Sequence, residues 1–514
     1  AYMFDVLMQI YESYGYTTRE AVASIVENNL YGLDIDDRAA QLAYFAVMMK
    51  ARQYDRRFFS RGIQPHVYAI AESNHVDSFA LEYFCNGDAK LKKAMDTIIS
   101  ELHDAKEYGS IITVSQQDWS ALYDRFAEIT EDINMSRETA LRELLPLVQV
   151  AEAMVQKYDV VVTNPPYMGA SGMSAKLTDF VKKNYSDSKS DLFAVFIEKC
   201  GQMAKRNGYQ AMITQHAWMF LSSYEKLRMQ LRTSDIVNMA HLGPRAFEEI
   251  GGEVVQTTSF VFRKSHITDY KGEYCRLIEP TSQQGKEDMF LSGENRYEAD
   301  QSNFSKIPGS PVAYWWGNFK IFSLPKIRDF YESAGRNKTH NNELYTRNWW
   351  EISDTDRWQP YANGGIFRRW AGNDLDVVDW SSTAKEFYAS HGGLYNQKYC
   401  GKRGVCWNLI TSYKNGFRIK HEEHHYSSGA PTIIAQKDNF DFWLLAFLNS
   451  IVASTLLSMY NPTLNTTVGD VLDLPVQLKS NELIEAVSEE TVKLSQVDWD
   501  SYETSWDFKR SPLV

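Results

Sequence analysis

The sequence predicts an α/β protein in which a doubly wound, largely parallel sheet precedes a second domain of mixed α+β structure. Three observations lead to this prediction. An apolar, β-branched run over residues 160–163 ends abruptly at Asn164, as a buried strand does. Short β-rich runs alternate with helical patterns in the first half of the chain. Beyond residue 270 this alternation fades, and Trp, Tyr, Gly and Asn become frequent.

These changes in pattern divide the chain into three parts. Residues 1–270 contain the alternating strands and helices, with a largely helical insertion over residues 75–157. Residues 271–480 form the second domain, and residues 481–514 are an acidic helical tail or the start of a further region. The chain begins inside a helical pattern at Tyr2, with no capping residue before it. We therefore expect the sequence to be cut at its start.

Acidic residues follow the first two predicted strands. Residues 30–36 form a short strand that ends in acids, and Asp37 is placed to cap a helix over residues 38–54. In nucleotide-binding α/β folds, an acid at this strand tip accepts hydrogen bonds from ribose hydroxyls, so Asp34 and the adjacent Ile35 are candidate cofactor contacts. The alternative is that Asp34 only neighbours a helix cap. Glu72 ends the next strand and is a further candidate.

The motif Asn164-Pro165-Pro166-Tyr167 follows the apolar run. Proline fixes φ and keeps the preceding residue extended, so the Asn164 amide and nearby backbone carbonyls can point together into a cleft. Such a pair of acceptors can hold an amino group, and the Tyr167 ring can stack on a flat base. The alternative is an ordinary turn after a core strand.

Further strands are predicted over residues 208–214, 236–242 and 254–262, the last as an antiparallel edge, with a helix from Asp191 to Lys205. The polar stretch 169–174 is a candidate lid over a bound base. Phe247 precedes the last strand. It is a candidate second stacking face, although packing in the core is the common role of a Phe.

The formal net charge of −12 argues against a generally sticky polyanion binder, so any nucleic-acid contact must come from local patches. Residues 391–420 contain six Lys and Arg side chains and no Asp or Glu, with aromatic residues between them. This is the composition of a phosphate-contacting surface, whereas a merely solvated face would not exclude acids. The predicted DNA contacts are Lys398, Lys402, Arg403, Lys414, Arg418 and Lys420, extended by Arg368 and Arg369; the interleaved aromatics are Tyr395, Tyr399, Trp407, Tyr413 and Phe417.

Five scattered cysteines and the absence of a recognisable signal peptide predict a reduced, cytoplasmic protein without disulfides. Cys400 and Cys406 precede His421, His424 and His425, but this spacing fits no standard zinc finger, so no metal is expected. The apolar run 442–457 is too short and too polar to span a membrane, which favours a buried helix.

Several segments together resemble the PglX family of adenine-specific DNA methyltransferases from BREX phage-defence systems, and related fused restriction-modification enzymes. The resemblance covers nearly the whole chain. The family also has a long N-terminal region, a Gly-rich cofactor motif and further C-terminal sequence that this sequence does not contain, so the resemblance implies that the chain is the middle portion of such a protein. The segments that carry the resemblance are residues 31–40, Asn164–Tyr167, residues 247–252, residues 306–315 and residues 449–475.

The resemblance implies a Rossmann-like fold that binds S-adenosylmethionine and a target-recognition domain that binds double-stranded DNA. It also implies that Asn164 and the carbonyl of Pro165 accept hydrogen bonds from the amine of a flipped adenine, that Tyr167 stacks on the base, and that other defence-system proteins are possible partners. No strong base is needed, because the rate comes from placement and electrostatics.

Two other classes of function remain open at this stage. One is an enzyme that methylates RNA or a protein glutamine, which the Asn-Pro-Pro-Tyr motif alone permits. The other is a non-catalytic DNA-binding fragment. The basic, aromatic window argues against the first class, and a cofactor titration would separate the second from an enzyme.

Overall fold

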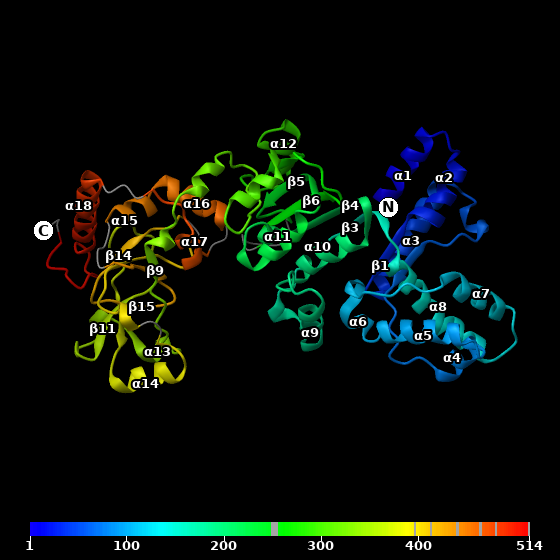
Figure 1. Cartoon of the computed structure of the whole chain (residues 1–514), viewed down its shortest axis with the longest axis horizontal. Coiled ribbons are helices and arrows are strands. Elements are labelled where there is room, and N and C mark those ends of the chain that lie inside the picture. Colours follow the sequence, from blue (N-terminus) through cyan, green and yellow to red (C-terminus); the bar gives the residue numbers. More distant parts are fainter. Residues whose placement is uncertain are drawn as a thin grey trace. The chain divides into compact units, whose positions relative to one another are not determined.

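The computed structural model of the chain describes residues 1–247, 255–394, 397–411, 414–437, 442–461, 465–477 and 481–511 (Figure 1). These residues form a mixed α/β structure with several sheets. They divide into two compact units, neither of which is one continuous stretch. The first unit comprises Ala1–Gln215, Thr233–Ala240 and Thr257–Ile267, and the second comprises His216–Arg232, His241–Gln256 and Thr268–Val514.

The first unit opens with helices around a parallel strand pair. Strand β1 (Tyr31–Asp34) pairs with β2 (His66–Ala69) in register, Tyr31 opposite His66 and Asp34 opposite Ala69. Helix α3 is capped by Asp36, whose carboxylate accepts the Arg38 and Ala39 N–H groups, and not by Asp37 as the sequence suggested. Asp37 is already in the first turn of the helix. The helices are α1 (Tyr2–Ser13), α2 (Thr18–Ser24) and α3 (Asp37–Tyr54).

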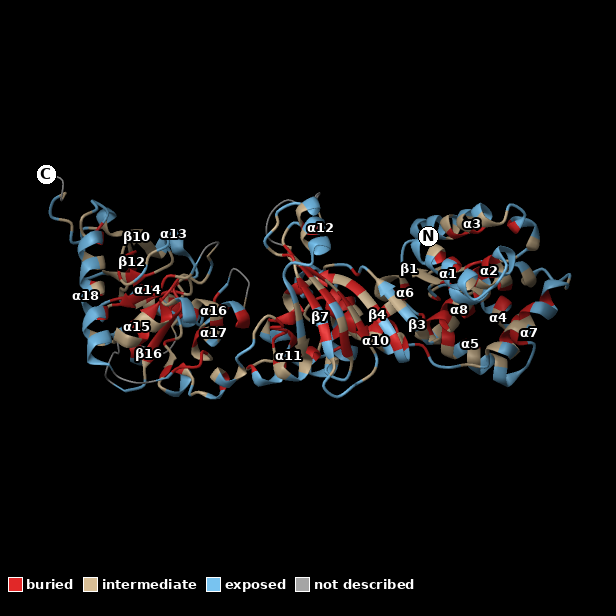
Figure 2. Ribbon diagram, turned by 90° about the horizontal axis from the view of Figure 1, so that it is seen from above, coloured by how far each residue is buried: buried red, intermediate tan, exposed pale blue. Residues whose placement is uncertain are grey.

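The helical insertion predicted after β2 is confirmed. Its helices pack their apolar faces into one core, and Figure 2 shows their outer faces exposed. Pro146 lies inside the last of them without ending it. The helices are α4 (Ser78–Cys85), α5 (Ala89–Glu101), α6 (Ala105–Tyr108), α7 (Trp119–Thr130) and α8 (Ser136–Val155).

The strand that carries the Asn-Pro-Pro-Tyr motif is β3 (Tyr158–Thr163). It pairs in parallel with β4 (Ala204–Gln215), and β4 pairs antiparallel with β6 (Thr257–Arg263). Strand β5 (Asp235–Gly243) follows β6 in the order β3-β4-β6-β5. The antiparallel strand therefore lies inside the sheet and not at its edge as predicted, which agrees with the burial of Phe260, Phe262 and both threonines of β6.

Helices α9 (Ala175–Asn184) and α10 (Leu192–Met203) connect β3 to β4. Strands β1 and β2 are not hydrogen-bonded to this sheet, although the sequence predicted one continuous sheet. Between β1 and β3 lies a cavity of about 160 Å³, bordered by the rings of Tyr31 and Tyr158 with centroids 5.4 Å apart. Among the described residues β3 has a ladder partner on one side only. Its Val160 and Val162 are 45% and 54% exposed.

The second unit contains an antiparallel strand pair, two four-stranded sheets and short helices. The pair consists of β7 (Lys271–Arg276) and β8 (Arg296–Asp300), and α12 (Gln283–Ser292) lies in the segment that connects them. One sheet has the order β10 (Thr346–Asn348), β12 (Asp376–Asp379), β11 (Trp358–Ala362), β15 (His425–Tyr426). The other has the order β14 (Arg418–Lys420), β13 (Gly404–Cys406), β16 (Thr432–Ala435), β9 (Tyr331–Ser333).

The apolar run near residue 450 forms two helices and not the single helix predicted. The Asn449 amide bonds both backbone groups of Phe417, at 3.1 and 2.9 Å, and Ser450 caps a new helix. Among the described residues no single helix is long and apolar enough to cross a membrane; α15 and α16 reach that length only together and are bent by 63°. The helices are α11 (Glu225–Leu231), α13 (Asn342–Tyr345), α14 (Ser382–Ser390), α15 (Phe442–Leu448), α16 (Ile451–Tyr460), α17 (Val468–Leu472) and α18 (Glu482–Trp499).

Candidate active site

The Asn-Pro-Pro-Tyr motif forms the loop directly after β3. Thr163, the last strand residue, pairs with Met212 of β4, so the loop starts from a hydrogen-bonded strand end. Pro165 is buried, whereas Asn164 and Pro166 are exposed. The buried proline packs against the unit, and Asn164 beside it is accessible to solvent. The amine-binding role of Asn164 stays a prediction.

Tyr167 is half-buried and its ring is fixed from one side. Phe193, the second residue of α10, meets it edge-on with ring centroids 6.1 Å apart. The Tyr167 hydroxyl is buried and has no hydrogen-bond partner among the described residues. Burial raises the pKa of Tyr167 to about 12, so the phenol is neutral at physiological pH. The side chain therefore offers an uncharged ring whose hydroxyl is not used by the fold.

The backbone after Tyr167 is hydrogen-bonded to the segment at the start of α10. The Met168 N–H donates to Asp191 Oδ1 at 3.0 Å, and the Leu192 N–H donates to the Met168 carbonyl at 3.0 Å. Sequence reasoning placed Asp191 only at the start of a helix. Its contact with the Asn-Pro-Pro-Tyr loop joins residues 23 positions apart, and no local sequence pattern predicts it.

The predicted lid, residues 169–174, is docked on the segment around α6. The Ser174 hydroxyl donates to a Glu107 carboxylate oxygen, and Lys176 Nζ pairs with Asp104 Oδ2 at 2.9 Å. The Tyr108 ring stacks on Phe180, with centroids 4.3 Å apart. Opening this segment would require breaking these contacts, most of which are exposed and therefore weak.

The predicted cofactor residues gather around Lys106 of α6. Lys106 Nζ donates to the Ile35 carbonyl at 2.9 Å and pairs with Asp37 Oδ1 at 2.7 Å. The Lys106 N–H donates to a Glu72 carboxylate oxygen at 3.4 Å. Sequence reasoning missed Lys106, because a lysine in a long helical stretch carries no signal of its own. The structure thus brings Ile35 and Glu72 together at the ends of β1 and β2.

Asp34 is exposed at the end of β1, and one of its oxygens accepts the Asp36 N–H at 2.9 Å. The cavity between β1 and β3 is lined by Leu33 and Thr163, the residues immediately before Asp34 and Asn164. Each candidate residue therefore directly follows a residue that lines this cavity, although neither Asp34 nor Asn164 lines it. An exposed carboxylate fits a ribose diol, but 160 Å³ is below the roughly 300–1,000 Å³ of typical ligand pockets, so the cavity can take only part of a nucleoside cofactor.

The basic window of the second unit is less exposed than its composition predicted. Arg418 and Lys420 lie in β14 and are 2% and 1% exposed. Arg418 donates to Asn408 Oδ1 at 3.0 Å, and Lys420 donates to the Lys402 carbonyl at 2.8 Å. Burial lowers the pKa of Lys420 to about 8. These two cations are buried and hydrogen-bonded within the unit, and in this conformation neither can contact a phosphate.

The other Lys and Arg side chains of residues 391–420 are at the surface. Two of them, and Arg368 from the predicted extension, form ion pairs with acidic residues that lie outside this range. Lys398 pairs with Glu332 at 3.8 Å, Arg403 with Glu422 at 3.4 Å, and Arg368 with Asp498 at 2.6 Å. Lys414 and Arg369 are exposed and Lys402 is half-buried. Tyr395 and Tyr413 lie outside the described residues, as do residues 248–252 of the resemblance. Phe247 is half-buried and belongs to the second unit, so its stacking role stays a prediction.

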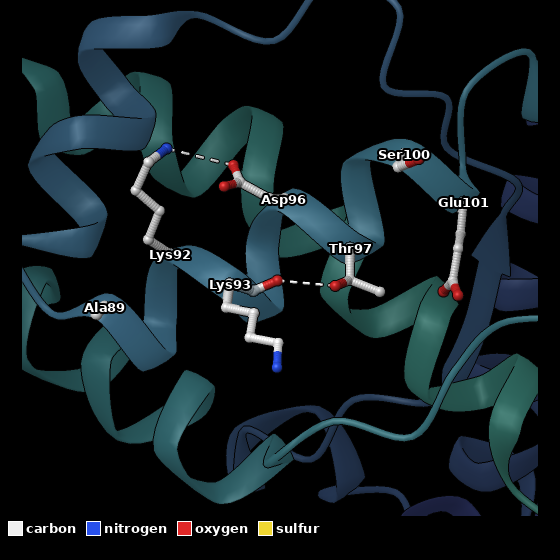
Figure 3. A pocket seen from close by; sticks show the side chains of 7 residues that line it. All are labelled: Ala89, Lys92, Lys93, Asp96, Thr97, Ser100 and Glu101. Carbon is white, nitrogen blue, oxygen red and sulfur yellow. Dashed lines mark hydrogen bonds and ion pairs between the residues drawn. The ribbon is translucent and has the colours of Figure 1, made fainter.

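Two further hollows were not predicted. One lies along α5 and has a volume of about 570 Å³; all seven lining residues, shown in Figure 3, come from that single helix, so it is an open surface. The other, of about 480 Å³, is lined in the second unit by side-chain amides, hydroxyls and backbone of Asn337–His340, Asn342, Tyr361, Asn363 and Ser427–Gly429. Among the described residues no group of His, Cys, Asp and Glu could hold a metal ion.

Comparison with known proteins finds one family model and homologues that match nearly the whole chain. Residues 28–247 match the Eco57I restriction-modification methylase family. The whole chain is 37% identical to the adenine-specific methyltransferase PglX of Lacticaseibacillus casei (strain Zhang), and 99% of it is 34% identical to the adenine-specific methyltransferase BrxX of Escherichia coli O9:H4 (strain HS). The chain is a homologue of PglX and BrxX. The resemblance seen in the sequence is confirmed.

The chain spans 46% of the PglX relative and 45% of the BrxX relative. Among solved structures, the type IIL restriction-modification enzyme MmeI in complex with DNA has a TM-score of 0.53 over 98% of this chain and 70% of that one, at 10% identity. Identity this low shows a shared fold and no more. The homologue of PglX described here therefore shares a fold with this restriction-modification enzyme.

Proposed function

We propose that the protein is a site-specific DNA adenine N6-methyltransferase that uses S-adenosylmethionine and acts in phage defence. The observation that carries the proposal is the loop after β3. An exposed Asn164 and a fixed, uncharged Tyr167 ring follow a parallel strand, and the cavity beside that strand is lined by Thr163 and by Leu33, the residue before Asp34. Homology to proteins named adenine-specific methyltransferases supports the same reaction.

We infer that β1–β2 and β3-β4-β6-β5 are two parts of one Rossmann-like, doubly wound arrangement. Both β1–β2 and β3–β4 are parallel pairs, and acids end β1 and β2 as they do in nucleotide-binding folds. On this inference residues 1–270 are the methyltransferase domain and residues 271–480 are the target-recognition domain. Asp34 would accept hydrogen bonds from the ribose of the cofactor, with Ile35 and Glu72 beside it.

The chemistry proposed for the loop is positioning. The Asn164 side-chain oxygen and the Pro165 carbonyl accept the two hydrogens of the adenine amine, which turns the nitrogen lone pair toward the methyl donor. Tyr167 stacks on the flipped base and compensates part of the energy lost on leaving the duplex. S-adenosylmethionine, when bound, supplies an electrophilic methyl group. No residue of the loop needs to become charged.

The DNA contact proposed for the second unit rests on its exposed cations. Of the predicted contacts, Arg369, Lys398, Arg403 and Lys414 are exposed, and Arg368 and Lys402 are half-buried. Solved relatives in complex with DNA have the same fold. Other proteins of the defence system are further proposed partners.

The test is methyl transfer by the complete protein from labelled S-adenosylmethionine to duplex DNA, RNA or protein, with the product identified by mass spectrometry. N6-methyladenine at a defined sequence in duplex DNA is the expected result. Transfer to RNA or to a glutamine side chain would replace the proposed substrate. A protein that binds DNA without binding the cofactor would be a non-catalytic module.

A further inference from the structure

Asp191 connects the catalytic loop to helix α10 through one carboxylate oxygen. Oδ1 accepts the Met168 N–H at 3.0 Å and the Phe193 N–H at 3.2 Å. Met168 directly follows Tyr167 in the chain, and Phe193 is the residue whose ring meets the Tyr167 ring edge-on. One oxygen therefore bonds the backbone next to the stacking residue and the backbone of its packing partner. The side chain is 8% exposed.

Backbone hydrogen bonds also join the two segments, residues 168–170 and residues 190–192. The Leu192 N–H donates to the Met168 carbonyl at 3.0 Å, and the Ala170 N–H donates to the Ser190 carbonyl at 3.2 Å. Gly169 and Asp191 form an antiparallel bridge. The loop end is thus held by three hydrogen bonds within three residues, of which only the bond to the carboxylate depends on a side chain.

A helix cap alone does not account for this geometry. The other aspartates that cap helices in the first unit accept N–H groups from their own helix: Asp36 from α3, Asp77 from α4, Asp88 from α5 and Asp118 from α7. Asp191 accepts from its own helix and also from a loop 23 residues earlier in the chain. A cap of α10 would be equally good with its partner in the helix only.

The electrostatics are consistent with a charge held in place by donors. Burial raises the pKa of Asp191, and hydrogen bonds from the Phe193 and Met168 N–H groups act against this rise. The start of a helix also favours a negative charge. An ionised Asp191 accepts both bonds, and charge-assisted hydrogen bonds are roughly twice as strong as neutral ones.

We propose that Asp191 is a positioning residue for methyl transfer, because it fixes the Met168 backbone and with it the orientation of the Tyr167 ring and the Asn164 amide. This inference rests on the proposed function. It assigns to a residue outside the Asn-Pro-Pro-Tyr motif the task of holding that motif in the geometry that the reaction needs. A loop displaced by about 1 Å can lose on the order of a hundredfold in rate.

The test uses the complete enzyme and separates two roles of Asp191: capping helix α10 and holding the Met168 backbone. Asp191→Ser keeps a good helix-capping residue, but its hydroxyl is too short to reach the Met168 N–H as well. Asp191→Asn keeps an oxygen at the Oδ1 position and can accept both bonds. Asp88→Ser is the matched control, because it makes the same change at a cap of α5 that contacts only its own helix.

Each variant is measured for thermal unfolding, for kcat and KM with duplex DNA, and for the fluorescence of 2-aminopurine placed at the adenine that the wild-type enzyme methylates. We expect Asp191→Ser to lower kcat by about 10- to 100-fold, with KM and the unfolding temperature close to those of Asp88→Ser. The 2-aminopurine signal should also fall, because an unfixed Tyr167 stacks poorly. Asp191→Asn should restore most of kcat.

A value of kcat for Asp191→Ser equal to that of Asp88→Ser would overturn the proposal. So would a loss of activity that follows only the fraction of unfolded protein, since a structural cap would explain it. A wild-type enzyme that transfers no methyl group to DNA refutes the proposed function itself and is recognised without any variant.

Discussion

The imidazole rings of His216 and His241 are hydrogen-bonded to each other inside the second unit, with His216 Nδ1 and His241 Nε2 2.8 Å apart. The second ring nitrogen of His241, Nδ1, lies 3.1 Å from the Tyr314 hydroxyl oxygen. Burial lowers the pKa of His216 to about 4, and it lowers the pKa of His241 well below 6.5, helped by His216, Arg276 and Lys286. Both rings are therefore neutral in the folded protein at physiological pH.

This pair predicts acid instability of the second unit. A histidine whose pKa is lower in the folded state binds protons more weakly than in the unfolded chain, so stability is complete above pH 6.5 and is lost as the pH falls toward 4. A shift from 6.5 to about 4 corresponds to about 3 kcal/mol for His216. Urea unfolding at pH 7.5, 6, 5 and 4 measures the effect.

The comparison is with the wild-type protein. We expect His216→Gln to flatten the pH dependence of the unfolding free energy between pH 6.5 and 4 relative to wild type. Equal slopes for the variant and the wild type would mean that other groups cause the acid instability.

Asn164→Ala should abolish methyl transfer and leave DNA affinity nearly intact. The amide is exposed and no hydrogen bond of the described fold uses it, so its loss should not unfold the loop. Removal of one preorganised polar group typically lowers kcat by at least about a hundredfold. Turnover and DNA binding are measured on the same preparation, with Asn28→Ala as an exposed control in the same unit. Wild-type turnover by Asn164→Ala would end the catalytic assignment.

Features that depend on neighbouring residues could be predicted from the sequence. The strand before Asn164, the acids at the ends of β1 and β2, and the helical insertion all follow from local patterns, and the structure has them. Features that depend on distant partners could not. Asp191 contacts Met168 across 23 residues, and the Asn449 amide breaks an apolar helix by bonding Phe417, 32 residues away.

The charge composition of residues 391–420 also gave a wrong prediction of surface exposure for two cations. Counting charges over residues 391–420 gave Arg418 and Lys420 the same weight as Arg403, because a sequence does not state which residues of a short strand face the interior. Likewise, the end-to-end pattern of strands predicted one sheet. A sequence pattern gives strand order along the chain, whereas the hydrogen bonds leave β1–β2 separate from β3.

Tyr167→Phe should be tolerated, whereas Tyr167→Ala should weaken methyl transfer by about 1–3 kcal/mol through lost stacking on the base. The hydroxyl has no hydrogen-bond partner among the described residues, so its removal breaks no bond of the fold. The two variants are compared for kcat and for 2-aminopurine fluorescence. If Phe were as damaging as Ala, the hydroxyl would have a role in the complex with DNA, and stacking would not explain the residue.

Arg403→Gln and Arg418→Gln should change different properties, DNA affinity in the first and stability in the second. Arg403 is exposed, so its replacement should lower the slope of log affinity for DNA against log salt by about one unit and leave the unfolding temperature unchanged. Arg418 is buried and donates to Asn408, so its replacement should destabilise the second unit. A normal unfolding temperature with a reduced salt slope for Arg418→Gln would show that β14 opens on DNA.

Asp34→Ala should weaken S-adenosylmethionine binding and leave DNA affinity unchanged. The carboxylate is exposed at the end of β1, and the only N–H that it accepts in the described fold belongs to Asp36, two residues away. Its loss therefore removes a ribose acceptor with little effect on folding. The matched control is Asp37→Ala, three residues after Asp34, which removes an exposed carboxylate that pairs with Lys106. Calorimetric titration of both variants with S-adenosylmethionine and with duplex DNA measures the four affinities. We expect only Asp34→Ala to lose about tenfold or more in cofactor affinity, the range for one charge-assisted hydrogen bond. Unchanged cofactor affinity in Asp34→Ala would move the ribose site away from β1.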